Sequence, residues 1–369
     1  MPTSHQQNIP HDIAAASDYR RHAKQHLSEA VWHYIDGGSA DEITKADNRT
    51  CFDAIKLRSR VLCDLTGATT ESELLGQSLA YPFLIAPMAY QTLLNPLGEL
   101  ATVMAAGAQD IGFVLSTLAS TSIEDVAQQY QQSQSSSPLW FGLYVQTDWR
   151  ETLSLIERAQ HNGYQALMIS VDAPVNGLRN REQRAGFSLP SDVCAVNLIN
   201  NNQDRIDYNQ YKNPVLARLQ DSAPTWELIE KIINFTSLPV IIKGILDPQD
   251  ALKAKAIGAS AIVVSNHGGR VLDGAISSID ALPSIRQAVG QDFSIMLDSG
   301  ITRGSDIFKA IALGANSVLI GRVVLYALAT AGPMGVAHAL KILKDEFELT
   351  MGLCGAKTIN DITEDKLLT

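Results

Sequence analysis

Eight short apolar segments recur along the chain, and each is followed by sequence with helical character. They are Phe83–Ala86, Phe113–Ser116, Trp140–Val145, Ala166–Val171, Val240–Lys243, Ala261–Ser265, Ser294–Asp298 and Ser317–Gly321. Most neighbours lie about 22–33 residues apart, which is the spacing of strand-plus-helix units. Eight such units favour a closed barrel over an open sheet. We therefore predict an α/β fold, a (β/α)8 TIM barrel over residues 81–330.

The remaining residues are predicted to belong to the same single domain, which spans residues 1–369. An N-terminal extension over residues 1–80 contains a helix over Ala14–Ile35 and either closes the barrel bottom or flanks its mouth. Residues 331–369 form a C-terminal helical segment. Between strands, Asp247-Pro248 marks the start of a helix over Asp247–Ile257, and another helix is predicted over Gly304–Leu313.

One interval, between the fourth and fifth apolar segments, is much longer than the others, at about seventy residues. It contains residues 188–221, which are rich in Asn, Gln, Asp and Ser. Long segments without regular structure are usually functional lids or disordered regions when they interrupt a compact domain. We predict a long loop after strand 4 that is mobile and covers the active site, with disorder as the alternative.

The net charge of -10 argues against nucleic acid or an anionic membrane as the main partner. No apolar run approaches the length of a membrane span, and the polar N-terminus lacks a signal-peptide core. The four cysteines have no zinc-ligand spacing, so we expect no metal site and free thiols in a reducing compartment. These features predict a soluble cytoplasmic protein.

Polar side chains follow the predicted strands at the ends where parallel barrels carry their chemistry. His267 and Arg270 come after one buried strand, and together they suit acid–base chemistry on an anion. Each such residue has a structural alternative: a core histidine, a helix cap or a strand terminator. Their joint occurrence on one barrel face favours a site. The other strand ends carry Tyr144, Ser170, Asp172, Arg179 and Lys243.

The last two strand ends are rich in glycine and carry Asp298-Ser299-Gly300 and Gly321-Arg322. Barrels commonly bind phosphate there, through backbone N–H groups and a helix N-terminus. Two such loops in consecutive units, one followed by an arginine, indicate a phosphorylated cofactor.

With these motifs the chain resembles the FMN-dependent α-hydroxy acid oxidase and dehydrogenase family, which includes glycolate, lactate and p-hydroxymandelate oxidases. The resemblance extends from about Ser28 to Ile359. The motifs that carry it are Tyr34–Gly38, Ile85–Ala89, Leu143–Val145, Val171–Pro174, Val240–Gly244, Ser265–Arg270, Leu297–Gly304 and Ile320–Arg322.

The resemblance implies oxidation of an (S)-2-hydroxy acid to the 2-oxo acid. His267 would be the base, and the sequence leaves open whether it takes the α-proton or the hydroxyl proton. Asp172 would orient and stabilise the charged imidazole. Arg179 and Arg270 would bind the substrate carboxylate, and Tyr34 and Tyr144 would donate hydroxyls to the substrate.

The same resemblance implies FMN as the cofactor and assigns its contacts. Lys243 would lie near the flavin pyrimidine edge and stabilise the reduced ring. Asp298 would bind the ribityl chain. The ring would be bound by Pro87, Met88, Ala89, Ser116, Ser170 and Ser265, and the phosphate by Ser299, Gly300, Gly321, Arg322 and, in place of a missing arginine, Arg303.

The chain departs from the family pattern at three positions. Gly142 stands where the family usually has Gln, and Thr302 stands where it usually has Arg; both bear on FMN affinity. Leu118 replaces the Trp of glycolate oxidase, which implies a roomier pocket and a bulkier substrate.

The electron acceptor is left open by the sequence. Ala89 favours an oxidase that uses O2 and releases H2O2, because several family dehydrogenases have Gly there. A dehydrogenase with a quinone or another acceptor is the close alternative. A flavin-barrel isomerase lacks the carboxylate cluster it would need, and Gly142 and Thr302 motivate a degenerate binding protein as a remote alternative. The resemblance also implies a homo-oligomer, commonly a tetramer.

Overall fold

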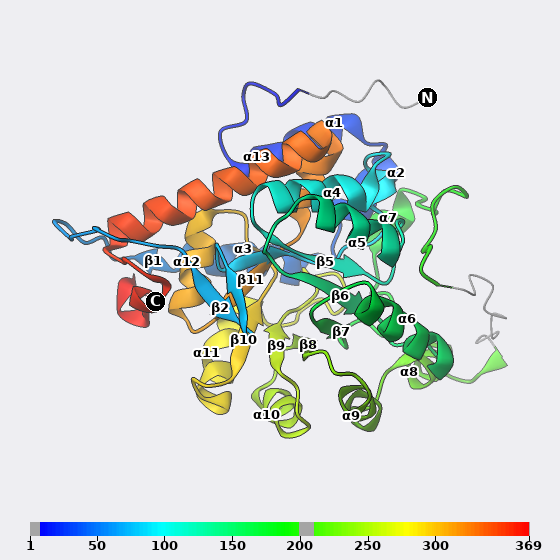
Figure 1. Cartoon of the computed structure of the whole chain (residues 1–369). Helices are drawn as coiled ribbons and strands as arrows, with labels where there is room; N and C mark the ends of the chain where they lie inside the picture. The colour runs from blue at the N-terminus through cyan, green and yellow to red at the C-terminus, as the bar shows by residue number, and fades with distance from the viewer. Residues whose placement is uncertain (1–7, 199–209, 369) are drawn as a thin grey trace.

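Eight parallel strands close into a barrel, as the sequence predicts (Figure 1). The computed structural model describes residues 8–198 and 210–368. The strands follow one another around the barrel in chain order, and the last pairs with the first, Val318 opposite Phe83. They are β4 (Phe83–Ile85), β5 (Gly112–Ser116), β6 (Leu139–Leu143), β7 (Leu167–Ser170), β8 (Val240–Ile245), β9 (Ala261–Val264), β10 (Ser294–Leu297) and β11 (Ser317–Ile320).

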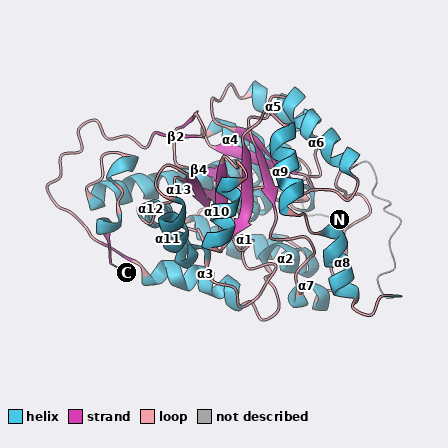
Figure 2. Ribbon diagram, turned by 90° about the horizontal axis from the view of Figure 1, so that it is seen from below, coloured by secondary structure: helices cyan, strands magenta, loops and turns pink. Residues whose placement is uncertain are grey.

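Helices surround the barrel on its outside (Figure 2). Several helices begin at a polar N-cap residue whose side chain accepts a backbone N–H of the first turn. Asp247 accepts from the Gln249 N–H at the start of α10, and Asp148 and Thr225 cap α6 and α9 in the same way. The predicted helices over Asp247–Ile257 and Gly304–Leu313 are confirmed as α10 and α12. The helices between strands are α4 (Gly98–Ala108), α5 (Ile123–Gln132), α6 (Trp149–His161), α9 (Trp226–Phe235), α10 (Pro248–Ala256), α11 (Ser278–Val289) and α12 (Gly304–Ala312).

The strands are buried on both faces, and their side chains alternate between two clusters. On β9, Ala261 and Val263 belong to one cluster, whereas Ile262 and Val264 belong to the larger one. The smaller cluster includes Trp140 and Met296, and both are fully buried. Burial on both faces explains why the segments appear as continuous apolar runs rather than alternating patterns.

The N-terminal extension occupies both of the places that the sequence left open. The hairpin of β2 (Ser72–Leu74) and β3 (Gln77–Leu79) packs Leu74 and Leu79 against the smaller cluster and closes one end of the barrel. The Trp140 indole N–H donates to Gln77 Oε1 at 2.9 Å. The helices α2 (Glu29–Asp36) and α3 (Ile43–Ala54) contact the strand-end loops at the opposite end.

The segment Ala14–Ile35, which the sequence predicts to be helical, is helical over most of its length but is broken into separate pieces. The structure has a 3-10 turn η1 (Ala16–Asp18), then α1 (Tyr19–His26), and a break before α2. Leu27 is extended at φ −96°, ψ 150°, and the Ser28 hydroxyl accepts from the Val31 N–H to start the next helix. The Ser28 N-cap signal outweighs the continuous apolar periodicity across this stretch.

The C-terminal helix α13 (Arg322–Cys354) corrects the expectation that no segment has the length of a membrane span. By length and composition α13 could cross a membrane, but 78% of its most apolar window is buried within the protein. It bends at Ala331 and Gly332, which have non-helical backbone angles before Pro333. It lies against α1, α4 and α12 and serves as a core helix (Figure 1). The short strand β12 (Leu367–Leu368) pairs with β1 (Lys56–Leu57) after the turns η4 (Ile359–Asp361) and η5 (Glu364–Lys366).

In the described part of the long interval after β7, α7 (Asn180–Arg184) and α8 (Pro214–Ser222) precede α9. The segment predicted as a mobile loop, residues 188–221, therefore ends within α8. Its central part, residues 199–209, lies outside the described residues. Its mobility and its role over the barrel mouth stay predictions.

Candidate active site

His267 is at the centre of a hydrogen-bonded group at the end of β9. Its Nδ1 lies 3.0 Å from Asp172 Oδ1, and its Nε2 lies 3.3 Å from the Tyr144 hydroxyl. The residue has a left-handed backbone, with φ +57°. Its N–H donates to the Ser265 hydroxyl, which holds the turn. A histidine in this sparsely populated conformation is held there by its surroundings, as is common at functional sites.

Asp172 is close to two cationic side chains. Burial alone would raise its pKa, but the charges of His267 and Lys243 outweigh burial and keep the pKa below its ordinary value. One oxygen, Oδ2, is buried without a hydrogen-bond partner among the described residues. Asp172 therefore stays ionised and is placed to orient the neighbouring imidazole.

A β-bulge places Lys243 in the site. The register between β8 and β9 shifts between Lys243 and Ile245, and Gly244 between them has φ +113°. A Cβ on Gly244 would lie 2.4 Å from the Asp172 Cβ. Glycine is thus required here both by its backbone angle and by the close approach of the Asp172 side chain.

The Lys243 ammonium is buried and fully paired. It lies 3.0 Å from Asp298 Oδ2 and 2.9 Å from the Ser265 hydroxyl. Burial would lower its pKa, but the charges of Asp298 and Asp172 outweigh it and raise the pKa above its ordinary value. Lys243 therefore carries a fixed positive charge in a region of low dielectric.

Arg270 is held by backbone carbonyls at the C-terminal end of α2. Its Nη1 donates to Tyr34 O at 2.8 Å and to Gly37 O at 2.9 Å, and its Cζ lies 5.4 Å from the centroid of the Tyr34 ring. Burial, together with the charges of Arg179 and Arg322, lowers the pKa of Arg270 to about 9. Such a concentration of positive charge favours an anionic ligand.

In the part of the chain that the structure describes, Arg179 makes one long ion pair, 3.5 Å to Glu182 Oε2. Its Nε is buried without a hydrogen-bond partner among the described residues. A buried N–H without a partner is costly unless a ligand binds it. Together, Arg179 and Arg270 have the geometry and charge to bind a carboxylate, and we call this pair the carboxylate clamp.

The predicted phosphate-binding end forms one connected group. The Gly268 N–H donates to the Ser299 hydroxyl, which in turn donates to Asp298. Arg322 opens α13 and donates to Ile35 O and Gly37 O. A Cβ on Gly321 would meet nothing nearer than 3.9 Å. Open space beside a helix N-terminus and an arginine fits the phosphate of FMN.

The remaining predicted flavin contacts lie at neighbouring strand ends. Ser116, Ser170 and Ser265 are buried at the ends of β5, β7 and β9. Pro87, Met88 and Ala89 follow β4 and are partly exposed. Of the predicted site residues, Arg303 is the one whose side chain is bound elsewhere. It is half-exposed and forms an ion pair with Glu346 of α13 at 3.2 Å. The structure thus gives no support to Arg303 as a phosphate ligand.

The structure supplies a physical reason for two departures from the family pattern. A Cβ on Gly142 would lie 2.7 Å from the Pro87 Cβ, so a Gln there would displace the turn after β4. Thr302 stands where the family usually has an arginine, and here the arginine beside this loop is Arg49 of α3. Its guanidinium donates to Gly300 O at 3.0 Å and to the Thr302 hydroxyl at 2.9 Å. Arg49 therefore holds the predicted phosphate loop from outside it.

Several residues that build the site escaped the sequence analysis. Asn48 and Asn266 exchange two amide hydrogen bonds, at 2.9 and 2.7 Å, and so fix the turn that carries His267. Asp36 is fully buried beneath the α2 carbonyls. A usable signal was present, because Thr44, Asn48 and Phe52 form a buried stripe on α3 at a spacing of four residues. A polar amide on such a stripe indicates a specific partner.

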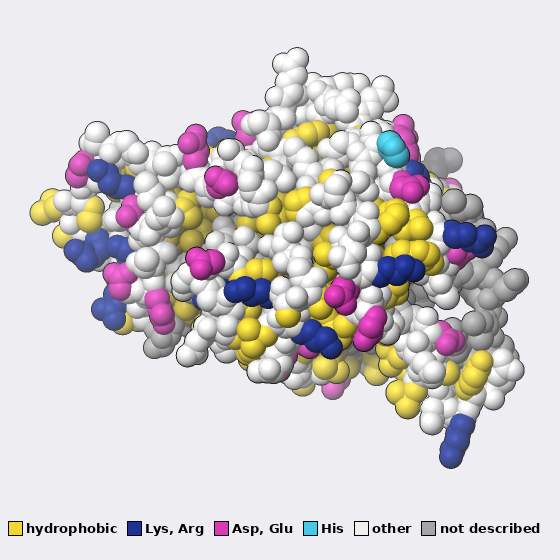
Figure 3. Space-filling model, turned by 60° about the horizontal axis from the view of Figure 1, so that its bottom comes forward, with side chains coloured by type: hydrophobic (Ala, Val, Ile, Leu, Met, Phe, Trp, Pro, Cys, Tyr) yellow, Lys and Arg dark blue, Asp and Glu magenta, His cyan; other side chains and the backbone are white. Residues whose placement is uncertain are grey.

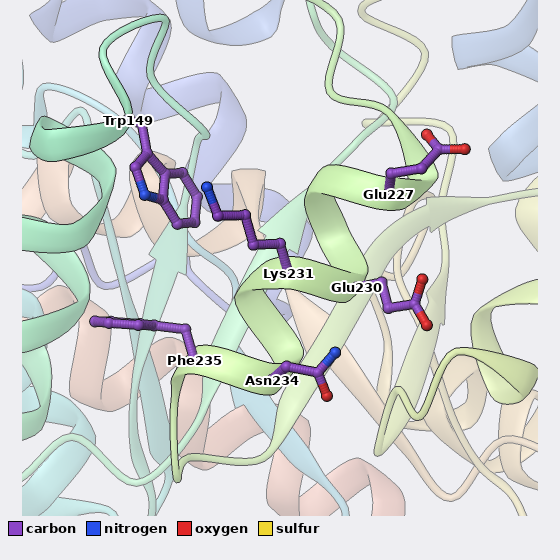
Figure 4. A pocket seen from close by; sticks show the side chains of 6 residues that line it. All are labelled: Trp149, Glu227, Glu230, Lys231, Asn234 and Phe235. Atoms are coloured by element: carbon purple, nitrogen blue, oxygen red, sulfur yellow. The ribbon is translucent and has the colours of Figure 1, made fainter.

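A surface hollow of about 460 Å³ lies elsewhere, between α6 and α9. Figure 4 shows its lining, in which the Lys231 ammonium is 4.0 Å from the Trp149 ring centroid. None of its lining residues belongs to the strand-end group. On the face shown in Figure 3, basic and acidic side chains are interspersed, so that face has no large single-sign field to attract nucleic acid.

The chain is similar over most of its length to known proteins. The model of the FMN-dependent dehydrogenase family matches residues 23–369. The chain is 45% identical to an L-lactate oxidase from a Nostoc species, covering 94% of this chain and 95% of that protein. It is 40% identical to an L-lactate dehydrogenase from Azorhizobium caulinodans, covering 96% and 98%. A structure of mandelate oxidase with benzoyl-formic acid aligns with a TM-score of 0.85 at 38% identity, covering 96% and 97%.

Proposed function

Because the chain belongs to the FMN-dependent dehydrogenase family and oxidises a 2-hydroxy acid with FMN, we propose that it is an oxidase that passes the electrons to O2. The products would be the 2-oxo acid and H2O2. The observation that carries the reaction is the His267–Asp172 pair beside a buried lysine and two arginines.

His267 acts as the proton acceptor in this reaction. Its Nδ1 is fixed by Asp172, so Nε2 faces the Tyr144 hydroxyl and is the nitrogen available to the substrate. The ionised Asp172 stabilises the imidazolium that forms when the proton is taken. A positioned base of this kind contributes about 10²–10⁴-fold in rate.

The carboxylate clamp fixes the substrate. Arg270 is already oriented by the α2 carbonyls, and the unpaired N–H of Arg179 is free to complete the contact. Burial raises the pKa of the Tyr34 hydroxyl, and it raises the pKa of the Tyr144 hydroxyl to about 12. Both hydroxyls therefore stay protonated and can donate hydrogen bonds to the substrate. The substrate carboxylate is thus bound, and its α-carbon is turned towards His267.

The cofactor residues on this chain fit FMN. When bound, FMN supplies the two-electron acceptor for the hydroxy acid. Lys243 would supply a fixed positive charge to stabilise the reduced ring, and Gly321 with Arg322 would hold the phosphate. The serines at the ends of β5, β7 and β9 supply further hydrogen-bonding groups.

The choice of O2 as acceptor rests on Ala89 and on the relatives. Three lactate oxidases are similar to this chain at 39–45% identity, and lactate dehydrogenases are similar at 38–40%. Oxidases and dehydrogenases share the first half-reaction, so the dehydrogenase with another acceptor is the second candidate function.

The substrate is proposed to be lactate or a bulkier 2-hydroxy acid. Leu118 follows β5 two residues after Ser116, whose hydroxyl accepts from the Leu118 N–H at 3.1 Å. A leucine in this place leaves more room than a tryptophan. The relatives include both lactate and mandelate oxidases, whose substrates differ by a phenyl ring in place of a methyl group.

The test is spectroscopic. The purified protein should be yellow, and anaerobic addition of the right (S)-2-hydroxy acid should bleach the flavin absorbance. Lactate and mandelate should be compared in the same titration. If a saturating panel of 2-hydroxy acids leaves the flavin oxidised, the function is wrong.

The acceptor is tested separately. Turnover with O2 should equal or exceed turnover with an artificial quinone acceptor, and H2O2 should form in a 1:1 ratio with the 2-oxo acid. A reduced enzyme that reoxidises with the quinone but hardly with O2 would make the protein a dehydrogenase.

We also propose a cytoplasmic homotetramer. The four cysteines, Cys51, Cys63, Cys194 and Cys354, are free thiols, which suits a reducing compartment. The tetramer rests on the family resemblance. Light scattering coupled to gel filtration would measure the assembly, and cell fractionation would test the location.

A further inference from the structure

Asp36 is a buried carboxylate that the reaction itself does not use. It ends α2, is completely buried, and accepts hydrogen bonds from Arg20 at 2.7 and 3.0 Å and from the Tyr326 hydroxyl at 2.8 Å. Arg181 and Lys45 approach it at 3.2 and 3.4 Å. Burial would raise its pKa, but these cations and hydrogen bonds outweigh it and hold the pKa well below its ordinary value.

One link runs from Asp36 along α2 to the carboxylate clamp. The next residue, Gly37, accepts from Arg270 at 2.9 Å through its carbonyl, and Tyr34 O accepts from the same nitrogen at 2.8 Å. The Asp36 side chain anchors the last turn of α2, so it fixes the carbonyls that orient Arg270. The negative end of a helix dipole also suits a guanidinium.

A second link runs through Arg181 to the other half of the clamp. Arg181 lies in α7, two residues after Arg179. Its Nη2 donates to Asp36 at 3.2 Å, and its Nη1 donates to Glu42 at 2.9 Å. These contacts set the position of α7, and therefore of Arg179, relative to α2.

We infer that Asp36 is a positioning residue that holds Arg179 and Arg270 in register, and that it thereby sets the selectivity of the enzyme for a carboxylate over an uncharged ligand. The inference rests on the clamp role proposed above. The two arginines come from segments far apart in the sequence. Asp36 binds Arg181, which lies in the segment that carries Arg179. It also directly precedes Gly37, whose carbonyl accepts from Arg270.

The charge of Asp36 is essential to this role. Arg20, Lys45 and Arg181 share this buried anion. An uncharged side chain would leave Glu42 as the carboxylate that still pairs with Lys45 and Arg181, so three neighbouring cations would be poorly neutralised. Their mutual repulsion would move α7 away from α2 and loosen the clamp. A bidentate carboxylate contact depends strongly on geometry, whereas an amide ligand makes weaker and less directional contacts with arginine.

The test compares an acid with its own amide. KM and kcat are measured by flavin reduction for (S)-lactate and (S)-mandelate and for the corresponding 2-hydroxy amides, with wild-type holoenzyme and Asp36→Asn. We expect KM for the acids to rise by at least about tenfold, a 1.4 kcal/mol change. We expect KM for the amides to change by less than about threefold and kcat for the acids to fall less than KM rises.

The matched control is Asp12→Asn. Asp12 is an exposed carboxylate of the same extension that also binds an arginine, Arg21 at 2.7 Å, but it is not connected to the clamp. This variant should leave the acid-to-amide ratio unchanged.

The outcomes separate this inference from the proposed function. If no 2-hydroxy acid reduces the flavin of the wild-type enzyme, the proposed function is wrong. A working wild type with equal losses for acid and amide in Asp36→Asn, or with no loss, overturns the positioning role alone. If Asp36→Asn does not fold, Arg181→Gln is measured in the same way, because it cuts the link to α7 and should show the same selective loss.

Discussion

The strand ends of the barrel supply the site with side chains, whereas the N-terminal extension supplies it mainly with backbone carbonyls and a buried carboxylate. His267 and Asp298 follow barrel strands, and Lys243 lies within β8 at its bulge. By contrast, α2 contributes Tyr34 O, Ile35 O and Gly37 O to the arginines that face the site. The barrel thus provides the reacting groups, and the extension holds the charged groups in place.

The difference is also electrostatic. Two buried side chains at the strand ends have a carboxylate partner: Lys243 with Asp298, and His267 with Asp172. Where the strand ends meet the extension, Arg270 and Arg322 instead donate to backbone carbonyls of the extension. Dipoles orient the guanidinium without cancelling its charge, so Arg270 keeps its attraction for an anion.

The largest expected effect belongs to the strand ends. His267→Ala should retain FMN but slow anaerobic flavin reduction by at least about two orders of magnitude. FMN retention is read from the absorbance of the desalted protein. Reduction at nearly the normal rate would remove His267 from its role as the base.

Arg270→Lys tests the place where the two regions meet. An ammonium has no planar fork, so it cannot donate to both α2 carbonyls and still bind a carboxylate in a bidentate manner. We expect kcat/KM for the hydroxy acid to fall by at least about tenfold, mostly through KM. An unchanged KM would show that charge alone, and not orientation by the extension, is what Arg270 contributes.

The pH dependence of the wild type sharpens the same point. Burial and the charges of Arg179 and Arg322 lower the pKa of Arg270 to about 9, from an ordinary value of 12.5. A guanidinium keeps its proton over the working pH range, and a bound carboxylate opposes the downward shift, so KM for the hydroxy acid should stay flat between pH 7 and 10. Stopped-flow reduction measures this range, and a KM that rises as the pH passes about 9 would show that Arg270 loses its charge there.

Gly37→Ala perturbs the extension while leaving every site side chain intact. A Cβ at Gly37 would lie 2.3 Å from His33 O, so the last turn of α2 must shift, and its carbonyl with it. We expect a several-fold rise in both KM and the dissociation constant of FMN, since Gly37 O holds both Arg270 and Arg322.

Gly352→Ala is the control for this change. It lies in α13, and the nearest atom to an added Cβ, Leu65 Cδ1, is at an ordinary 3.4 Å. Alanine also favours a helix over glycine, so the control should keep both constants and not lose stability.

The sequence predicts the strand-end region well because its signals are local. A buried strand followed by His267 or Lys243 can be seen in one short window, and all eight strands are where the apolar segments lie. The extension is harder to predict because its contacts join residues far apart in the chain, such as Asn48 with Asn266. The helix break before α2 has a local signal, the Ser28 hydroxyl that caps the new helix.

The smallest expected effect concerns Arg303, the residue that sequence reasoning assigned to the phosphate. It follows Thr302 in the loop, but its side chain is 46% exposed and pairs with Glu346 instead. An exposed pair of this kind contributes about 0–1 kcal/mol to stability. Arg303→Gln should therefore change the FMN dissociation constant by less than about twofold, measured by recovery of flavin fluorescence on dilution.

Arg322→Gln, from the strand-end group beside Gly321, is the matched variant and should weaken FMN binding by at least about tenfold. If both variants weaken FMN binding equally, Arg303 must leave Glu346 when FMN binds. The loop after β10 would then bind the phosphate together with Arg322.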